Sequence, residues 1–374
     1  MKVLELISNH HWTGPAEPVL GLSEHMSSLG VDVRVACSLK PDGNLPAKIA
    51  DRGLSPFPEL SLYKRRFHPV YNIKDLRALA RSISDGEFDI LHCHLSHDHW
   101  LCLTARALSG SHVRIVRTVH NSAALRRRPL QGAAYRLSDG LISIGRRFAE
   151  TLEENFRLPG EKIAVIPGAV NHRRFRPPEN LAEIRRSYGF GEDQFLVGIV
   201  SRIKAGRGHP ELLDAFRVIS VEIPDSMLVM IGRGEFKSEM ENAAGRIGLS
   251  DRVRFLGYID EDLPQAVGML DLNVILGEGS DGSCRAALEA MACGVPVLAA
   301  PVGTLPETIE ADVTGVLLPA LSVRGITENV LRLARDREYT AGMGARAREA
   351  VESRFTEQGR AEATVRFFER LMVE

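Results

Sequence analysis

Short apolar segments alternate with amphipathic stretches along almost the whole chain. Many of them are continuous apolar runs, which are typical of strands buried on both faces of a parallel sheet. The predicted strands are residues 3–8, 31–37, 88–92, 113–118, 141–144, 163–166, 195–200, 227–231, 253–256, 272–276, 295–299 and 315–318. Helical patterns lie between them, for example at residues 211–216 and 283–292. Because strand–helix units repeat, we expect an α/β protein with parallel sheets.

One segment has the character of a boundary between two domains. Residues 171–180 are polar and basic, and Pro177-Pro178 cannot lie inside a helix. We interpret this segment as a linker between a domain of residues 1–172 and a second domain of residues 173–355. Residues 356–373 are amphipathic and predict a final helix, in which Phe367, Phe368, Leu371 and Met372 cluster. The length of 374 residues agrees with two or three domains, at about 150 residues each.

Composition is that of an ordinary globular protein, with 44% apolar and 25% charged residues. No stretch approaches the roughly 20 apolar residues of a membrane-spanning helix. The first seven residues are too short and too acidic for a secretory signal and instead predict a strand. The five cysteines are odd in number and form no CxxC pair. We therefore expect a cytoplasmic protein in a reducing environment.

Charge is unevenly divided between the two halves, although the net charge is only −1. Residues 1–172 carry 22 basic and 17 acidic side chains, whereas residues 173–374 carry 25 basic and 31 acidic ones. Random scatter is one explanation. The alternative is that the first half meets an anionic partner or surface, such as the inner face of a membrane. The basic clusters at residues 64–66 and 126–128 favour this alternative, and we expect no nucleic-acid partner.

A glycine-rich turn follows the predicted strand at residues 272–276 and leads into a predicted helix near Ser283. Free amides at the start of a helix attract anions, and Gly279 and Gly282 allow a phosphate to approach the backbone. Asp281 lies at the mouth of the turn and Glu289 lies on the helix eight residues later. Their carboxylates suit the hydroxyls of a ribose or a hexose. The alternative is a capped helix with a surface acid.

Two other loops are candidates for phosphate binding. Residues 201–209 follow a predicted strand and carry Arg202 and Arg207 with glycines between them. Guanidinium groups match phosphate oxygens well, although a solvated basic loop would have the same composition. Gly14, after the first strand, is a weaker signal because the segment is not a GxGxxG motif.

Histidines concentrate at residues 92–99. His92 and His94 have a spacing typical of metal ligands, and Asp98 and His99 follow. A metal-dependent hydrolase of the metallo-β-lactamase type would show HxHxDH, but here Ser96 and His97 intervene, so the aspartate and the last histidine come too late. The alternative is that His92 and His94 satisfy buried polar groups at a strand end.

Taken together, these motifs resemble the retaining GT-B glycosyltransferases of family four. Residues 88–94 resemble the family's DvvHvH strand, residues 117–120 its TxH strand end and residues 163–175 its linker motif. Asp281 and Glu289 fall on its E-x7-E motif, and residues 289–297 match EAMAxGvPVv closely. The order and spacing of these motifs extend over most of the chain.

The resemblance implies a GT-B fold, with two Rossmann-like domains facing each other across a cleft. It implies that the first domain binds the acceptor, that the second binds a nucleoside-diphosphate sugar, and that a helix at about 356–374 packs back on the first. No cofactor or metal ion would be needed, since the sugar nucleotide is a substrate.

The resemblance also implies roles for particular residues. Arg202 and Arg207 would bind the donor diphosphate, and Gly14 would approach it. The backbone amides at Gly282, Ser283 and Cys284 would face the phosphate and the sugar.

In the same way, Glu289 would hold the ribose and Asp281 the hydroxyls of the donor sugar, while His120 would face that sugar from the first domain. The chain departs from the family pattern at Asp281 and at Arg207, where glutamate and lysine are usual. It also departs at residues 167–171, which lack the usual asparagine and aspartate.

The implied reaction transfers a sugar from a UDP- or GDP-sugar to a hydroxyl of a glycan or lipid-linked acceptor, with retention of anomeric configuration. Cell-envelope polysaccharide or lipopolysaccharide synthesis is the expected setting. Two alternatives stay open at this point. One is a UDP-sugar 2-epimerase of the same fold, which would need no acceptor, and the other is the metal-dependent hydrolase.

Overall fold

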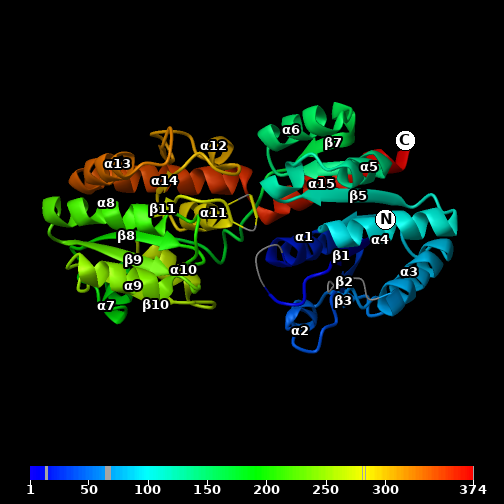
Figure 1. Ribbon diagram of the computed structural model, residues 1–374, viewed down its shortest axis with the longest axis horizontal. Coiled ribbons are helices and arrows are strands. Elements are labelled where there is room, and N and C mark those ends of the chain that lie inside the picture. Colours follow the sequence, from blue (N-terminus) through cyan, green and yellow to red (C-terminus); the bar gives the residue numbers. More distant parts are fainter. Residues whose placement is uncertain (13–15, 64–68, 280, 283, 374) are drawn as a thin grey trace. The chain divides into compact units, whose positions relative to one another are not determined.

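The structure is a computed structural model that describes residues 1–12, 16–63, 69–279, 281–282 and 284–373 (Figure 1). Two compact units make up the chain. Unit 1 consists of Met1–Gly168 with Glu357–Glu374, and unit 2 of Ala169–Thr356. The first crossing between units therefore falls within a few residues of the predicted linker.

Unit 1 contains a seven-stranded parallel sheet in the order β3-β2-β1-β4-β5-β6-β7. Its strands are β1 (Lys2–Ile7), β2 (Asp32–Cys37), β3 (Ser55–Pro56), β4 (Ile90–Cys93), β5 (Arg114–Val119), β6 (Gly140–Ser143) and β7 (Ile163–Val165). Six of these strands coincide with predicted strands, and β3 was not predicted. Both residues of β3 are exposed, so no apolar run marks it.

The helices of unit 1 cover both faces of this sheet (Figure 1). They are α1 (Ala16–Ser28), α2 (Leu45–Asp51), α3 (Pro69–Ser84), α4 (Ser96–Ser109), η1 (Ser122–Leu125), α5 (Pro129–Leu137), α6 (Arg146–Phe156), η2 (Gly160–Lys162) and α15 (Glu357–Val373).

The C-terminal helix α15 completes the core of unit 1. Phe368 and Leu371 are buried in one apolar cluster with Val3 of β1 and Ile90 of β4. A Cβ atom on Gly140 would lie 2.6 Å from the Phe367 ring, so the start of β6 must be a glycine for this helix to dock. Of the four residues expected to cluster on the final helix, Phe367, Phe368 and Leu371 are buried, whereas Met372 is 45% exposed.

Unit 2 contains a six-stranded parallel sheet in the order β10-β9-β8-β11-β12-β13. Its strands are β8 (Phe195–Val200), β9 (Ser226–Ile231), β10 (Val253–Gly257), β11 (Leu272–Ile275), β12 (Val297–Ala299) and β13 (Gly315–Leu317). All six were predicted from their continuous apolar runs. The helices are α7 (Leu181–Ser187), α8 (His209–Glu222), α9 (Lys237–Arg246), α10 (Leu263–Gly268), α11 (Arg285–Ala292), α12 (Leu305–Thr308), α13 (Val323–Arg335) and α14 (Arg337–Arg354).

Each sheet has one point at which the strand order reverses. In unit 1 the reversal falls between β1 and β4, and in unit 2 between β8 and β11. The loops after such a pair of strands run to opposite faces of the sheet, and ligands of open parallel sheets bind in the crevice between them. The fold therefore singles out the loops after β1, β4, β8 and β11. Among the helices that the structure describes, none is long and apolar enough to cross a membrane.

Candidate functional site

In unit 2, the loops after β8 and β11 touch through their backbones. A Cβ atom on Gly277 would lie 2.2 Å from the carbonyl oxygen of Gly206, and one on Gly208 would lie 2.3 Å from Cβ of Leu276. Gly208 also has a φ of 78°, which favours glycine. We call residues 201–208 and 276–284 the switch-point loops, with residues 280 and 283 outside the described part of the chain.

The two predicted phosphate-binding arginines lie on the first switch-point loop in different environments. Arg207 is half-buried and donates a hydrogen bond from Nη1 to the carbonyl of Gly277 over 3.4 Å. Burial lowers the pKa of its guanidinium, partly offset by Cys284 and Glu278. Arg202 is exposed and pairs with Glu235 at 3.3 Å. Arg207 is therefore held against the second loop, whereas Arg202 has only an exposed partner.

The second switch-point loop enters α11 through a strained residue. Cys284 has a φ of 49°, so the helix begins at Arg285 instead of near Ser283 as predicted. The amide of Cys284 donates to the carbonyl of Asp281 over 3.2 Å, and the carbonyl of Gly282 accepts from the amide of Thr304. Burial and the nearby Asp281 raise the pKa of the Cys284 thiol to about 12, so this thiol stays protonated at neutral pH.

Both predicted acids of this region are buried. Asp281 is 8% exposed and Glu289, on α11, is 4% exposed. Arg285 lies one helical turn before Glu289 and pairs with its Oε1 through Nε at 2.8 Å. Glu289 is therefore an ion-paired buried acid and not the surface acid of the alternative interpretation. Two other predicted site residues, Gly14 and Ser283, lie outside the described residues.

His209 is a site neighbour that the sequence analysis left without a role. It is buried at the start of α8, and its Nε2 lies 3.3 Å from Oγ of Ser201. Burial, with Arg207 nearby, lowers its pKa to about 4, so the ring is neutral at pH 7. Its position next to the Arg-Gly segment in sequence was the available signal.

In unit 1, a buried hydrogen-bond network crosses the strands on either side of the reversal. Glu5 of β1 accepts from Nδ1 of His92 over 2.9 Å and from Nε2 of His94 over 2.5 Å. Nδ1 of His94 lies 2.9 Å from Nε2 of His120, which follows β5. Nε2 of His92 lies 2.7 Å from Oγ1 of Thr118. All five side chains are at most 3% exposed.

The charges in this network follow from its hydrogen bonds. Burial alone would raise the pKa of Glu5, but His92 and His94 lower it to about 2, so Glu5 is a carboxylate. Burial, reinforced by His92, lowers the pKa of His94 to about 3. Burial, with His94 and Arg360 nearby, also lowers the pKa of His120 well below its usual range. At neutral pH the Glu5 carboxylate thus accepts hydrogen bonds from His92 and from a neutral His94.

The histidine cluster at residues 92–99 is not a single constellation in the structure. His92 and His94 meet at Glu5, and these three side chains lie close enough to hold a metal ion. Asp98 instead accepts from the amides of Ser8 and Leu95, and His99 contacts Oγ of Ser138 over 2.6 Å. The HxHxDH-like pattern therefore splits between separate structural roles. The ligand atoms of Glu5, His92 and His94 already face one another at hydrogen-bonding distance.

Glu5 is the functional candidate that the sequence analysis missed. The one available signal is a single acid within the apolar run of residues 3–7.

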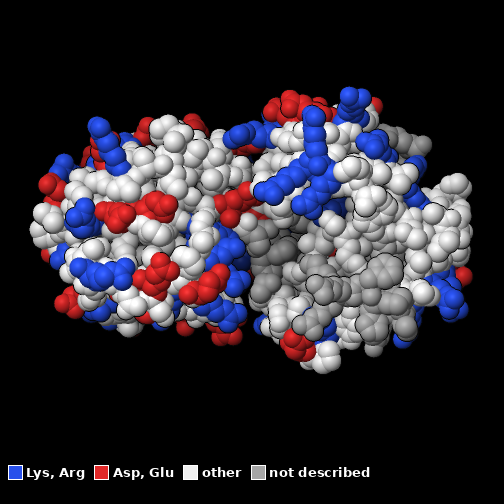
Figure 2. Space-filling view, viewed as in Figure 1, with Lys and Arg blue, Asp and Glu red and all other residues white. Residues whose placement is uncertain are grey.

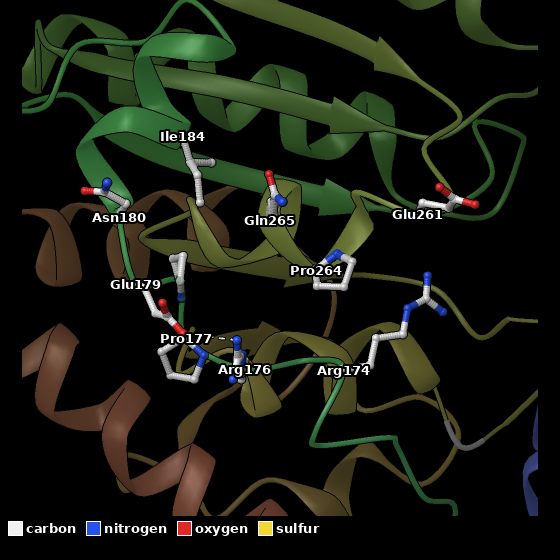
Figure 3. Close-up of a pocket in the computed structure, with 10 residues that line it drawn as sticks. Arg174, Arg176, Pro177, Glu179, Asn180, Ile184, Glu261, Pro264 and Gln265 are labelled. Carbon is white, nitrogen blue, oxygen red and sulfur yellow. Dashed lines mark hydrogen bonds and ion pairs between the residues drawn. The ribbon is translucent and has the colours of Figure 1, made fainter.

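A cavity of about 400 Å³ lies elsewhere in unit 2 (Figure 3). It is lined by the segment from Arg174 to Asn180 and by residues near α7 and α10. Arg174 closes one side by donating to the carbonyl of Asp260 over 2.7 Å. None of the predicted site residues lines this cavity.

Comparison with known proteins agrees with the fold and the motifs. Residues 181–350 match the family described as Glycosyl transferases group 1, and residues 13–174 match Glycosyltransferase Family 4. The chain belongs to glycosyltransferase family 4. It is a glycosyltransferase with a GT-B fold.

Individual relatives extend this comparison. The chain is 26% identical over 295 residues to N-acetyl-alpha-D-glucosaminyl L-malate synthase of Bacillus anthracis, covering 77% of this chain and 76% of the relative. It is 33% identical over 201 residues to GDP-mannose-dependent alpha-(1-6)-phosphatidylinositol monomannoside mannosyltransferase of Mycobacterium tuberculosis, covering 52% of each. The crystal structure of Anabaena HepE with UDP and glucose superposes with a TM-score of 0.81 at 19% identity, over 99% of this chain and 100% of HepE.

The buried neutral histidines predict a loss of stability in acid. The pKa of His99 falls to about 3 because burial disfavours its charged form. Between pH 6.5 and that value the unfolded chain binds the proton and the folded chain does not, so stability falls as pH decreases. Replacing His99 by Gln should reduce the slope of unfolding free energy against pH by about 1 kcal/mol per pH unit between pH 6 and pH 4.

Urea unfolding at pH 6, 5 and 4 measures this slope. The exposed His112, replaced by Gln, is the matched control. Equal slopes for the parent and His99→Gln would contradict a neutral buried His99.

Proposed function

We propose that the protein transfers a sugar from a UDP- or GDP-sugar to a hydroxyl of a glycan or lipid-linked acceptor, with retention of configuration. Unit 2 would bind the donor and unit 1 the acceptor. The observation that carries the donor assignment is the backbone contact of the two switch-point loops, which places Arg207 against Gly277 at the reversal of the sheet.

In this proposal the switch-point loops bind the donor diphosphate. Arg202 and Arg207 supply positive charge as the phosphate departs, and preorganised charge of this kind contributes most where negative charge develops. Glu289, held by Arg285, would accept hydrogen bonds from the ribose, and Asp281 from the sugar. Attack on the face from which the phosphate leaves, through an oxocarbenium-like state, would give retention. The protein would then need neither a nucleophile of its own nor a metal ion.

The relatives support the substrate class. One is named as GDP-mannose-dependent and acts on a phosphatidylinositol mannoside, and HepE crystallised with UDP and glucose. Cell-envelope glycan or glycolipid synthesis is therefore the setting that we propose.

A donor screen followed by a transfer assay tests the function. UDP- and GDP-sugars are compared for their effect on thermal unfolding, since a ligand at 100 times its Kd adds about 2.7 kcal/mol of stability. The best donor is then incubated with and without glycan or lipid acceptors, and the product's anomeric configuration is read by NMR. Conversion of the sugar nucleotide without acceptor would point instead to the 2-epimerase.

Replacements in the switch-point loops should separate donor binding from turnover. We expect Glu289→Gln to weaken donor binding about tenfold or more, because hydrogen bonds to a charged group contribute about 1.5–3 kcal/mol. We expect Arg202→Ala to slow turnover about 100-fold while the unfolding temperature stays near that of the parent. Titration calorimetry and initial rates measure the two effects.

Glu338→Ala and Arg324→Ala are the matched controls for that pair, because both residues are exposed in unit 2. Parent-like binding and turnover in Glu289→Gln and Arg202→Ala would show that the donor site is elsewhere.

Chelation should leave transfer unaffected. Two arginines and backbone amides supply the positive potential that a metal ion provides in other transferases, so we expect full activity in excess EDTA. Initial rates with and without EDTA, followed by addition of zinc or manganese, measure this. Loss of activity that zinc restores would return the group of Glu5, His92 and His94 to consideration as a metal site.

A basic surface of unit 1 is a candidate for contact with anionic lipid. Arg126, Arg127 and Arg128 are exposed between η1 and α5, and Leu130 beside them is 73% exposed. Figure 2 shows basic side chains in the region of unit 1 where Figure 1 places α5 and α6. The second basic cluster, residues 64–66, lies outside the described residues. We propose that this surface rests on a membrane near a lipid-linked or phosphorylated acceptor.

Liposome co-sedimentation tests this contact. Each arginine near an anionic surface contributes about 1 kcal/mol, so changing Arg126, Arg127 and Arg128 to Ser should release the protein from anionic vesicles at physiological salt. The control changes three exposed arginines of unit 2, Arg186, Arg324 and Arg335, to Ser and so removes the same charge. Equal binding of the parent to neutral and anionic vesicles would argue against the membrane surface.

A further inference from the structure

In the network that links Glu5, His94 and His120, the donor and the acceptor of each hydrogen bond can be assigned. An ionised carboxylate only accepts hydrogen bonds, so both imidazoles beside Glu5 donate to it. His94 therefore carries its proton on Nε2 and has a lone pair on Nδ1. That lone pair faces Nε2 of His120 at 2.9 Å, so His120 must donate from Nε2. Since a neutral imidazole has one N–H, the lone pair of His120 is on Nδ1.

The second branch of the network anchors the carboxylate. His92 donates to Glu5 from Nδ1, and its Nε2 lies 2.7 Å from the hydroxyl oxygen of Thr118. The ring of Phe368 on α15 packs edge-on against His92, with centroids 5.3 Å apart. Glu5 and His92 are also direct neighbours in the register of β1 and β4. Glu5 is thus held by backbone pairing, by a hydrogen bond and by packing.

The surroundings of His120 favour its neutral form. Arg117 on β5 and Arg360 on α15 are positive groups that disfavour an imidazolium. His94, its hydrogen-bond partner, is neutral. His120 is 3% exposed and lies just after the carboxyl end of β5, the strand next to β4 in the sheet. Nδ1 then carries the lone pair of His120 that the contact with His94 does not use.

We propose that Glu5 is a positioning residue for glycosyl transfer: through His94 it holds His120 as the Nε2–H tautomer, so that Nδ1 accepts a hydrogen bond from a hydroxyl of the sugar substrate. This inference rests on the proposed function, which gives His120 a sugar to contact. It adds that His120 acts as a hydrogen-bond acceptor toward the sugar, and that Glu5, two strands away, determines the tautomer of His120.

NMR of protein labelled with 15N-histidine tests the tautomer without any activity measurement. The His94 and His120 signals are assigned from His94→Gln and His120→Gln samples. At pH 7 the parent should show His120 with a protonated Nε2 and an unprotonated Nδ1. A His120 signal with Nδ1 protonated, alone or together with Nε2, would overturn the proposal.

A pair of variants tests whether Glu5 makes the choice. Glu5→Gln replaces two acceptors by one acceptor and one donor, so one histidine must present a lone pair to the amide. On the His92 side, Nδ1 can present the lone pair if Nε2 carries the proton and donates it to the Thr118 hydroxyl oxygen. In Glu5→Gln combined with Thr118→Val that route is closed, since a protonated Nε2 of His92 would lose its acceptor. His94 and His120 must then both switch to Nδ1–H.

The double variant is therefore compared with Thr118→Val alone. We expect Nε2–H at His120 in the single variant and Nδ1–H in the double variant. We also expect kcat/KM to be about tenfold lower in the double than in the single variant, which corresponds to about 1.4 kcal/mol. The Kd for the donor nucleotide, which reports on unit 2, should agree between the two. Backbone NMR spectra of both variants are compared with that of the parent to check that the variants are folded.

The outcomes separate this inference from the proposed function. Switched tautomers with unchanged kcat/KM would show that His120 does not accept from the substrate, and an unswitched tautomer would show that Glu5 does not set it. If the parent transfers no sugar from any nucleotide donor, the proposed function is overturned. The NMR spectra still show whether Glu5 determines the tautomers of His94 and His120.

Discussion

In each sheet the strand order reverses once, and the loops that follow the two strands at the reversal run to opposite faces of the sheet. This constraint determines where polar groups collect. At the carboxyl ends of β8 and β11, the loops that follow the two strands meet. In unit 2 they meet so closely that Gly277 has no room for a side chain beside Gly206. In unit 1 the equivalent pair, β1 and β4, brings Glu5 opposite His92. Every candidate residue in the structure lies within a strand or two of these reversals.

The two units use opposite electrostatic solutions at these positions. Unit 2 has permanent positive charge on Arg202 and Arg207 beside buried acids, an arrangement that suits an anionic ligand. In unit 1 the buried carboxylate of Glu5 accepts hydrogen bonds from His92 and His94. A buried carboxylate is tolerated only when such donors replace water. The arrangement in unit 2 suits binding of an anion, and the arrangement in unit 1 fixes which imidazole nitrogens carry protons.

Sequence reasoning recovered most of the fold because parallel strands buried on both faces are continuous apolar runs. It missed β3, which buries neither of its residues, and it placed the start of α11 too early because the positive φ of Cys284 has no sequence signature in a cysteine. It placed Arg202, Arg207, Asp281 and Glu289 on the correct loops and helix. It could not find the partner of His94, since the register that sets Glu5 beside His92 is a property of the sheet. The pairing of Arg285 with Glu289, by contrast, has a sequence signal, because the two residues are four apart on one predicted helix.

The docking of α15 has a consequence for the order of folding in the cell. The helix is synthesised after all of unit 2, yet Phe368 and Leu371 cover Val3 and Ile90 in unit 1. Until α15 has been synthesised, the part of the sheet that it covers is open to water and to other chains. The nascent N-terminal domain must therefore wait for all of unit 2, and chaperones that shield apolar surface would act during this interval.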